Sequence, residues 1–460
     1  MKLKTEVAIT FLGTVGATLF GVGSAVIFAR GLGTDGRGLL ALAMLVPTLS
    51  GTFCRMGQDT VNATFGGLYK NQRSALFVQT LLATLVGGSI SVLVIYAFYN
   101  WLPVDRGQFS RVSPMAVGLS CLIAPIMILS HSLLGLLRGV GKIKAAALLH
   151  LATGGSLFVF AVVFVLLIPS GVEGGLLANI LSLLVVVPGA VYLLREYVTL
   201  RLSVLTKALM LRSVTFGFQT SLATFSGYLI YRLDQGMLGY MVSAGQLGLY
   251  AVAVGLAERG RLIPKSISVV FLSRLSNELA QRQKHTAVVF RRTLTISILS
   301  VMLMGVVGGP AILLLFGWEY IGSIIPFLVL LPGIAALGGS SILSSDLLAR
   351  SKPKYAVIIS YTTLLFQVLQ NLVLIPHFGI LGAAVSSTTS YIAALVLVSA
   401  FYIRESKVPA RELLLRREDW VQTIKMGGEQ LGAVLAKVGL GRRRSPKGLS
   451  SAPRTDEESG

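Results

Sequence analysis

Two neighbouring membrane-length apolar segments of this chain carry ionisable residues. Arg232 and Asp234 lie in the first segment, and Glu258, Arg261 and Lys265 lie in the second. A charged side chain inside a bilayer costs about 2.5–3.5 kcal/mol on insertion scales, so such residues usually face the interior of a helix bundle or a water-filled path. We therefore expect these positions to line a route for charged or polar cargo.

The basic residues of the second segment predict a site for a phosphate-bearing group. Glu258, Arg261 and Lys265 are spaced i, i+3, i+7, which places them along one face of a helix. Arg and Lys supply charge-assisted hydrogen bonds to a pyrophosphate. The alternative is a structural Glu258–Arg261 pair, with Lys265 near the inner membrane interface.

Arg232 and Asp234 are two residues apart, so they point to nearly opposite sides of a helix and cannot pair within it. Arg232 either lines the route or reaches the outer interface. Asp234 either titrates during ion coupling or makes a packing contact. Glu258 and Asp59 are the other carboxylates that could titrate in this way.

Further polar residues fall within apolar segments. Arg55 and Asp59 are spaced i, i+4, so they form either a structural pair or a substrate contact. Gln367, Gln370 and Asn371 share one helix face, from which they either hydrogen-bond sugar hydroxyls or join neighbouring helices. The four histidines show no metal-site spacing and the chain has no P-loop. We expect no metal or cofactor, and H⁺ or Na⁺ coupling or passive flux.

These residues must be positioned by membrane helices, because the composition is that of a polytopic membrane protein. Of the 460 residues, 54% are hydrophobic and only 13% are charged, whereas a soluble domain is about a quarter charged. A spanning helix needs about 20 mostly apolar residues. Twelve segments predict an all-α fold: 7–29, 38–62, 75–99, 114–137, 146–168, 174–195, 213–239, 246–271, 293–316, 321–345, 355–376 and 379–403.

The basic residues predict the orientation of these spans. Lys and Arg cluster in one set of connecting loops and in the tail, whereas the other loops hold only Arg30, Arg37, Arg106 and Arg111. Because cytoplasmic loops carry the excess of Lys and Arg, both termini are predicted to be cytoplasmic. This asymmetry accounts for most of the net charge of +21 without a nucleic-acid partner.

The chain repeats itself at an offset of about 210 residues. Gly38-Leu-Leu-Ala-Leu-Ala43 matches Gly248-Leu-Tyr-Ala-Val-Ala253, and two later stations match in the same register. Six spans per repeat is an even number, so the halves are parallel, and such transporters bind substrate between them. The alternative is duplication of a membrane scaffold without transport. We predict bundles over 1–200 and 208–403, followed by a cytoplasmic basic tail over 404–460.

Three stretches resemble one family. Asp234 followed by Gly248-Leu-Tyr-Ala-Val-Ala253 looks like a signature of the oligosaccharide flippases of the multidrug/oligosaccharidyl-lipid/polysaccharide exporter superfamily. Ala29-Arg-Gly-Leu-Gly33 with Gly36-Arg-Gly38 and Ile375-Pro-His-Phe-Gly-Ile-Leu-Gly-Ala-Ala384 also resemble that family, over about residues 5–403. The resemblance implies two six-helix bundles around a central cavity and a sugar chain on polyprenyl pyrophosphate as cargo. The polar tail, in place of two further spans, argues against the lipid II branch.

The sequence thus predicts a monomeric flippase, not an enzyme, that moves lipid-linked oligosaccharide from the inner to the outer leaflet of a prokaryotic inner membrane. One alternative is an ion-coupled multidrug antiporter of the same superfamily, which predicts a more acidic and aromatic cavity. Another is a polysaccharide polymerase or glycosyltransferase, which usually needs a larger external loop. The segment 412–440, followed by Arg442-Arg-Arg444, is either an amphipathic helix on the inner leaflet or a solvated tail that could contact polysaccharide-assembly enzymes.

Overall fold

The described part of the chain is helical from end to end. The computed structural model describes residues 2–101, 107–199, 205–262, 264, 267, 282–350, 353–423 and 425. The first helices are α1 (Lys2–Cys54), α2 (Gln58–Leu68), α3 (Arg73–Trp101), α4 (Pro114–Gly139), α5 (Ile143–Ala161, extended by a π-helical turn over Val162–Leu167) and α6 (Gly171–Leu194). The later helices are α7 (Lys207–Met241), α8 (Ala244–Ala257), α10 (Arg282–Phe316), α11 (Ile324–Ala349) and α12 (Pro353–Ser406).

Two of these helices each hold two membrane spans. Backbone angles leave the helical region at Gly33 in α1 and at Gly379 in α12, where φ is 65° and 54°. Glycine adopts positive φ at little cost because it has no Cβ. With these two kinks, the helices correspond to the twelve predicted spans, and the all-α fold is confirmed.

Within the described residues, eight helices are long and apolar enough to cross a membrane by length and composition. Both kinked helices are among the eight and supply two spans each. The charged helix α7 and the 14-residue helix α8 are not among them. The membrane assignment of these two rests on their place beside the other spans.

Helices begin where the sequence supplies a cap. The hydroxyls of Ser113, Thr206 and Ser243 accept hydrogen bonds from backbone N–H groups in the first turns of α4, α7 and α8. Such caps satisfy donors that have no partner within the helix. They therefore fix where α7 and α8 start, and with them the positions of the charged residues.

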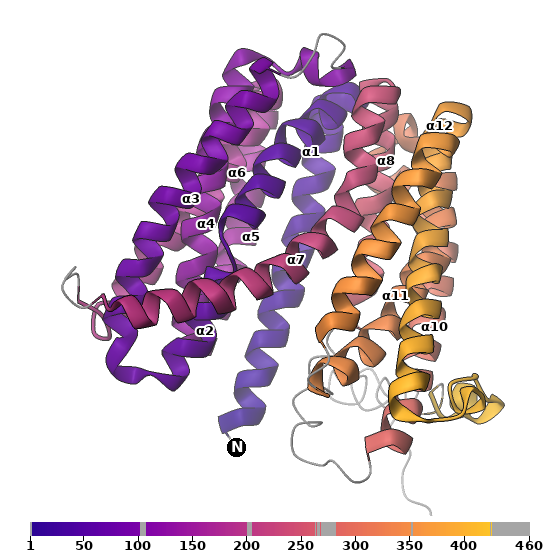
Figure 1. The fold of residues 1–460 in the computed structure, drawn as a ribbon. Coiled ribbons are helices and arrows are strands. Elements are labelled where there is room, and N and C mark those ends of the chain that lie inside the picture. The colour runs from indigo at the N-terminus through magenta and orange to yellow at the C-terminus, as the bar shows by residue number, and fades with distance from the viewer. Residues whose placement is uncertain are drawn as a thin grey trace, which may run out of the picture. The chain divides into compact units, whose positions relative to one another are not determined.

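Helix α7 links the helices that precede it to those that follow. Figure 1 shows α3–α6 at the left and α10–α12 at the right, with α7 running obliquely from below α3 toward α8. The first part of α7 packs against the end of α1 so closely that a Cβ on Gly57 would lie 2.5 Å from the Gly217 carbonyl oxygen. Its last part packs against α12, where the Ser387 hydroxyl donates to Asp234 at 3.1 Å.

The second part of α1 and the start of α8 meet through glycines. A Cβ on Gly38 would lie 1.9 Å from the Ala244 carbonyl oxygen, and a Cβ on Gly248 would lie 2.0 Å from the Thr34 carbonyl oxygen. Gly38 and Gly248 are the equivalent positions of the sequence repeat. Equivalent residues meet in this way when the axis that relates two parallel repeats passes between them.

Further contacts hold the same end of the molecule together. Arg30 donates to the carbonyl oxygens of Leu314 and Leu315 at 2.6 Å each, and the Tyr320 hydroxyl donates to the Ala29 carbonyl at 2.9 Å. These bonds join the kink of α1 to the end of α10 and the turn after it. We call this set of contacts, with the Gly38–Gly248 contact, the kink-end closure.

The chain forms two compact units, Met1–Leu413 and Leu414–Gly460. The predicted division of the first unit into bundles at 1–200 and 208–403 stays a prediction. Most of the segment 412–440, for which an amphipathic helix is an alternative, lies outside the described residues.

Candidate substrate cavity

Two adjoining hollows lie beside α1 and α8, the first also lined by residues of α5, α6 and α10 and the second by residues of α7. Their volumes are about 250 and 320 Å³. Arg37 lines both hollows, Arg259 lines the first and Arg232 lines the second. Because the hollows also share Ala41 and Gly255, we treat them as one space, the arginine cavity. Its walls come from both halves of the chain.

Arg37 does not lie where the sequence predicts. The prediction was an outer loop, whereas Arg37 lies inside α1, four residues past the kink at Gly33, and is partly buried. The kink turns the chain without a loop, so the helix resumes at once and carries Arg37 into the cavity wall. The signal available in the sequence was the glycine-rich stretch Gly31–Gly38 around it.

Arg232 forms a two-point ion pair with Glu258. Its two terminal nitrogens lie 3.2 and 3.1 Å from the two carboxylate oxygens. Glu258 is therefore paired with Arg232 and not with Arg261. Arg232 lines the cavity, which is the first of the two alternatives given for it above. A bidentate pair fixes the guanidinium plane, so Arg232 is held at the cavity with its charge partly balanced.

The stripe expected on the second charged segment is interrupted. Helix α8 ends at Ala257, and Glu258–Arg261 forms a 3-10 turn, which advances side chains by about 120° per residue instead of about 100°. Arg259 follows Ala251 and Gly255 at i, i+4 spacing and lines the cavity with them, and its guanidinium is also bonded to the Gly255 carbonyl. Arg261 lies over the Tyr231 ring, 4.1 Å from its centroid, in a cation–π contact. Lys265 lies outside the described residues.

Asp234 lies at the centre of a buried polar cluster. Its side chain is 1% exposed and accepts hydrogen bonds from the Tyr250 hydroxyl, from Ser387 at 3.1 Å and from the Gln235 backbone N–H at 2.7 Å. The amide of Gln367 donates to the same Ser387 hydroxyl at 3.1 Å. Helices α7, α8 and α12 thus converge on one carboxylate.

The other two amides predicted on this face differ in their contacts. Gln370 accepts from Thr389 at 2.5 Å, across the two parts of α12. Asn371 is fully buried, and neither of its amide atoms has a hydrogen-bond partner among the described residues. An unpaired buried amide costs about 1–3 kcal/mol. The role of all three amides in sugar binding stays a prediction.

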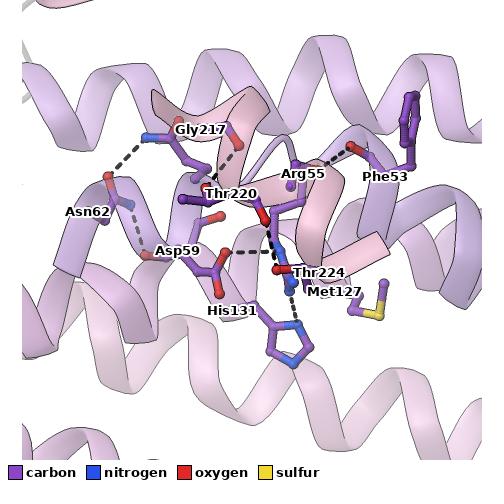
Figure 2. A network of polar contacts seen from close by, with 12 residues as sticks. Phe53, Arg55, Asp59, Asn62, Met127, His131, Gly217, Thr220 and Thr224 are labelled. Carbon is purple, nitrogen blue, oxygen red and sulfur yellow. Dashed lines mark hydrogen bonds and ion pairs between the residues drawn. The ribbon is translucent and has the colours of Figure 1, made fainter. Parts of the chain in front are cut away.

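Arg55 and Asp59 pair as their spacing predicts, at 3.2 Å, but not on a continuous helix. The chain leaves the helix at residues 55–57, where Met56 and Gly57 adopt φ of 48° and 64°. Arg55 also contacts His131 Nδ1 of α4 at 2.7 Å, and Figure 2 shows the guanidinium between Asp59 and His131. Sequence reasoning missed His131, because a single histidine 76 residues away gives no spacing signal.

The fold defined by these helices is shared by solved structures of transporters of the MOP superfamily. An inward-facing multidrug resistance transporter of that superfamily aligns with a TM-score of 0.69 at 16% identity, over 85% of this chain and 94% of that chain. The lipid II flippase MurJ in an inward closed conformation also aligns with a TM-score of 0.69, at 15% identity, over 93% and 92%. A family model described as "Polysaccharide biosynthesis protein" matches residues 3–272. The chain belongs to this polysaccharide biosynthesis family.

A curated relative is the capsular polysaccharide biosynthesis protein CapF of Staphylococcus aureus. The chain is 29% identical to it over 163 residues, which are 34% of this chain. The match spans about two fifths of the relative's length, 41%.

Proposed function

We propose that this protein is a flippase that moves a polyprenyl-diphosphate-linked oligosaccharide from the inner to the outer leaflet of a cell membrane. The observation that carries the proposal is the arginine cavity, which lies between the two halves of a chain from the polysaccharide biosynthesis family. The similarity to a lipid II flippase supports it. The activity is transport, not catalysis.

The three arginines suit a diphosphate. A guanidinium presents paired donors that match phosphate oxygens, and it stays charged at all physiological pH values. Arg37 and Arg259 line the cavity, and neither is in an ion pair with a carboxylate of the described residues, so their charges are free to attract a ligand. Arg232 would exchange its carboxylate partner Glu258 for a phosphate group when cargo binds.

Alternating access would operate by opening the kink-end closure. With the termini in the cytoplasm of a bacterial-type inner membrane, as the basic loops predict, that closure faces outward. The cavity would then load cargo from the inner side. Breaking the Arg30 and Tyr320 contacts and separating Gly38 from Gly248 would release the cargo outward.

Ion coupling would act at Asp234. Among the three candidate carboxylates, Asp59 is paired with Arg55 and Glu258 with Arg232, whereas Asp234 accepts its hydrogen bonds from the uncharged groups of Tyr250, Ser387 and the Gln235 backbone. A buried carboxylate without a cationic partner favours a bound proton or Na⁺. Coupling of this kind would need no cofactor.

The alternatives fit the cavity less well. A multidrug antiporter predicts a more acidic and aromatic cavity, whereas three arginines line this one. A polymerase or glycosyltransferase needs a group of catalytic side chains, and the family and fold support transport instead. Membrane lipids as surroundings, contacts with polysaccharide-assembly enzymes and a monomeric state stay predictions.

Reconstitution tests the proposal. Vesicles that contain the full chain and a fluorescent polyprenyl-diphosphate oligosaccharide are expected to lose label asymmetry faster than empty vesicles, measured with a membrane-impermeant quencher. Unchanged asymmetry in the presence of correctly folded protein would refute the flippase function.

A further inference from the structure

An apolar hollow lies on the opposite side of the α1–α7 contact from the arginine cavity. Its volume is about 410 Å³, and α1, α3 and α7 contribute most of its lining. The lining includes Leu49 and Phe53 of α1 and Leu233 and Met237 of α7, and the described residues around it contribute no charged side chain. We call it the apolar hollow.

The arginine cavity and the apolar hollow are separated by very little protein. Leu45 lines both of them. Gly236 of α7 faces Leu45. A Cβ added to Gly236 would lie 3.3 Å from a terminal methyl group of Leu45. Gln235, the residue next to this glycine, lines the arginine cavity. The α1–α7 seam is therefore closed at this point by one leucine side chain against a glycine.

We propose that this seam is a lateral portal through which the isoprenoid chain of the carrier passes while the diphosphate occupies the arginine cavity. The inference rests on the proposed function. The transfer of an isoprenoid chain from lipid to water would cost about 0.8 kcal/mol of free energy for each CH₂ group. A carrier whose diphosphate binds the arginines must keep its chain in an apolar space that adjoins them, and the seam supplies that connection.

The apolar space continues along α7. A second hollow of about 280 Å³ shares Phe53 and Cys54 with the apolar hollow and runs toward the start of α7, past Val214 and Phe218. Its lining also includes Arg55, which is paired with Asp59. An isoprenoid chain in this path could remain beside α7 while its head group crosses the membrane.

The Gly236→Leu variant tests the portal, with Gly227→Leu as its matched control. Both positions lie on α7, but a Cβ on Gly227 would meet no heavy atom within 4 Å, whereas a leucine at 236 fills the seam. Using the full chain in vesicles, we expect flipping of the fluorescent carrier to fall at least tenfold for Gly236→Leu. For Gly227→Leu we expect a rate within twofold of wild type.

Binding of inorganic pyrophosphate separates the two proposals. Calorimetry should give Gly236→Leu an affinity within twofold of wild type, because the arginines are unchanged. Failure of the wild-type protein to flip the carrier overturns the proposed function. A wild-type protein that flips while Gly236→Leu flips at the same rate overturns the portal alone.

A reversible block covers the case in which Gly236→Leu does not fold. In a Cys54→Ala, Cys121→Ala background, Gly236→Cys is reacted with a bulky methanethiosulfonate reagent after reconstitution. Flipping should fall at least tenfold and return on reduction, while labelled Gly227→Cys is unaffected. An unchanged rate overturns the portal. Equal blocking of a fluorescent phospholipid would show a general lipid path and overturn the assignment to the carrier.

Discussion

At the scale of single residues, the charged side chains of the membrane segments differ in how their charge is balanced. Glu258 balances Arg232 and Asp59 balances Arg55, whereas Arg261 lies over an aromatic ring. Arg37 and Arg259 line the cavity and are in no ion pair with a carboxylate of the described residues. The two arginines whose charge is not balanced in this way are thus the ones best placed to bind an anion.

Arg37→Ala is expected to reduce flipping by about 10- to 150-fold. A hydrogen bond to a charged group contributes about 1.5–3 kcal/mol, and this residue lines both parts of the cavity. The measurement is the rate of carrier flipping in vesicles. Arg195→Ala is the control, since Arg195 is exposed and stacks on Tyr192. Equal rates for both variants would mean that Arg37 does not touch cargo.

Asp234→Asn is expected to abolish the dependence of flipping on an ion gradient. The amide keeps most of the shape of the carboxylate, but it cannot take up a proton or balance Na⁺. Flipping is measured with imposed H⁺ and Na⁺ gradients, with the exposed Asp35→Asn as the control. A gradient dependence that survives in Asp234→Asn would place the coupling at another residue. A wild-type protein whose flipping does not depend on either gradient would show that the flux is passive.

At the scale of elements, breaks in helices position the site. The kink at Gly33 brings Arg37 to the cavity, and the turn at 55–57 brings Arg55 to His131. In a membrane every backbone polar group must be bonded within the protein. Irregular backbone therefore survives only where it is buried in protein or lines a water-filled space, which agrees with its occurrence around the cavity.

Gly248→Ala tests the closest helix contact. The added methyl would meet the Thr34 carbonyl oxygen at 2.0 Å, so α8 and α1 must separate, at a cost of about 1–3 kcal/mol for overpacking. We expect a lower melting temperature in detergent. Gly118→Ala on α4 is the control, because no heavy atom lies within 4 Å of its added Cβ. A Gly248→Ala protein as stable as wild type would contradict the tight contact.

The elements themselves were predictable, and the directions of their side chains were less so. Most of the spans follow from hydropathy, because only a helix satisfies the backbone across so many apolar residues, whereas the charged helix α7 and the short helix α8 fall short of that criterion. The placement of Arg37, Arg259 and His131 could not be predicted in this way. It depends on a glycine kink and on packing between distant helices. The repeat at Gly38 and Gly248 was visible in the sequence, but their mutual contact was not.

At the scale of the whole molecule, one end is held closed by contacts between the two halves of the chain. The kink-end closure joins α1 to α8, to α10 and to the turn after α10 through glycine contacts and hydrogen bonds. Arg30 lies at the end of α10, where carbonyl groups lack partners within the helix and the helix dipole favours a cation. Removal of this contact should favour opening at that end.

Arg30→Ala is therefore expected to increase access to the cavity from outside. A cysteine at Ala251, which lines both parts of the arginine cavity, would react faster with an impermeant thiol reagent in a background without Cys54 and Cys121. The control is Arg111→Ala, because Arg111 is exposed and lies near Asp35 at 3.8 Å. Unchanged reactivity in Arg30→Ala would show that this contact does not hold the end closed.

The close contact between α1 and α8 bears on how the chain evolved. Gly38 meets the start of α8, and Gly248 meets α1 just after its kink. If the two repeats descend from one six-helix unit, both glycines descend from a single position that faced its own copy in a symmetric pair. A larger side chain at that position would have been present on both sides of the contact. After fusion the two positions could change independently, yet each still faces the backbone of the other half. The ancestral symmetry therefore continues to constrain both positions.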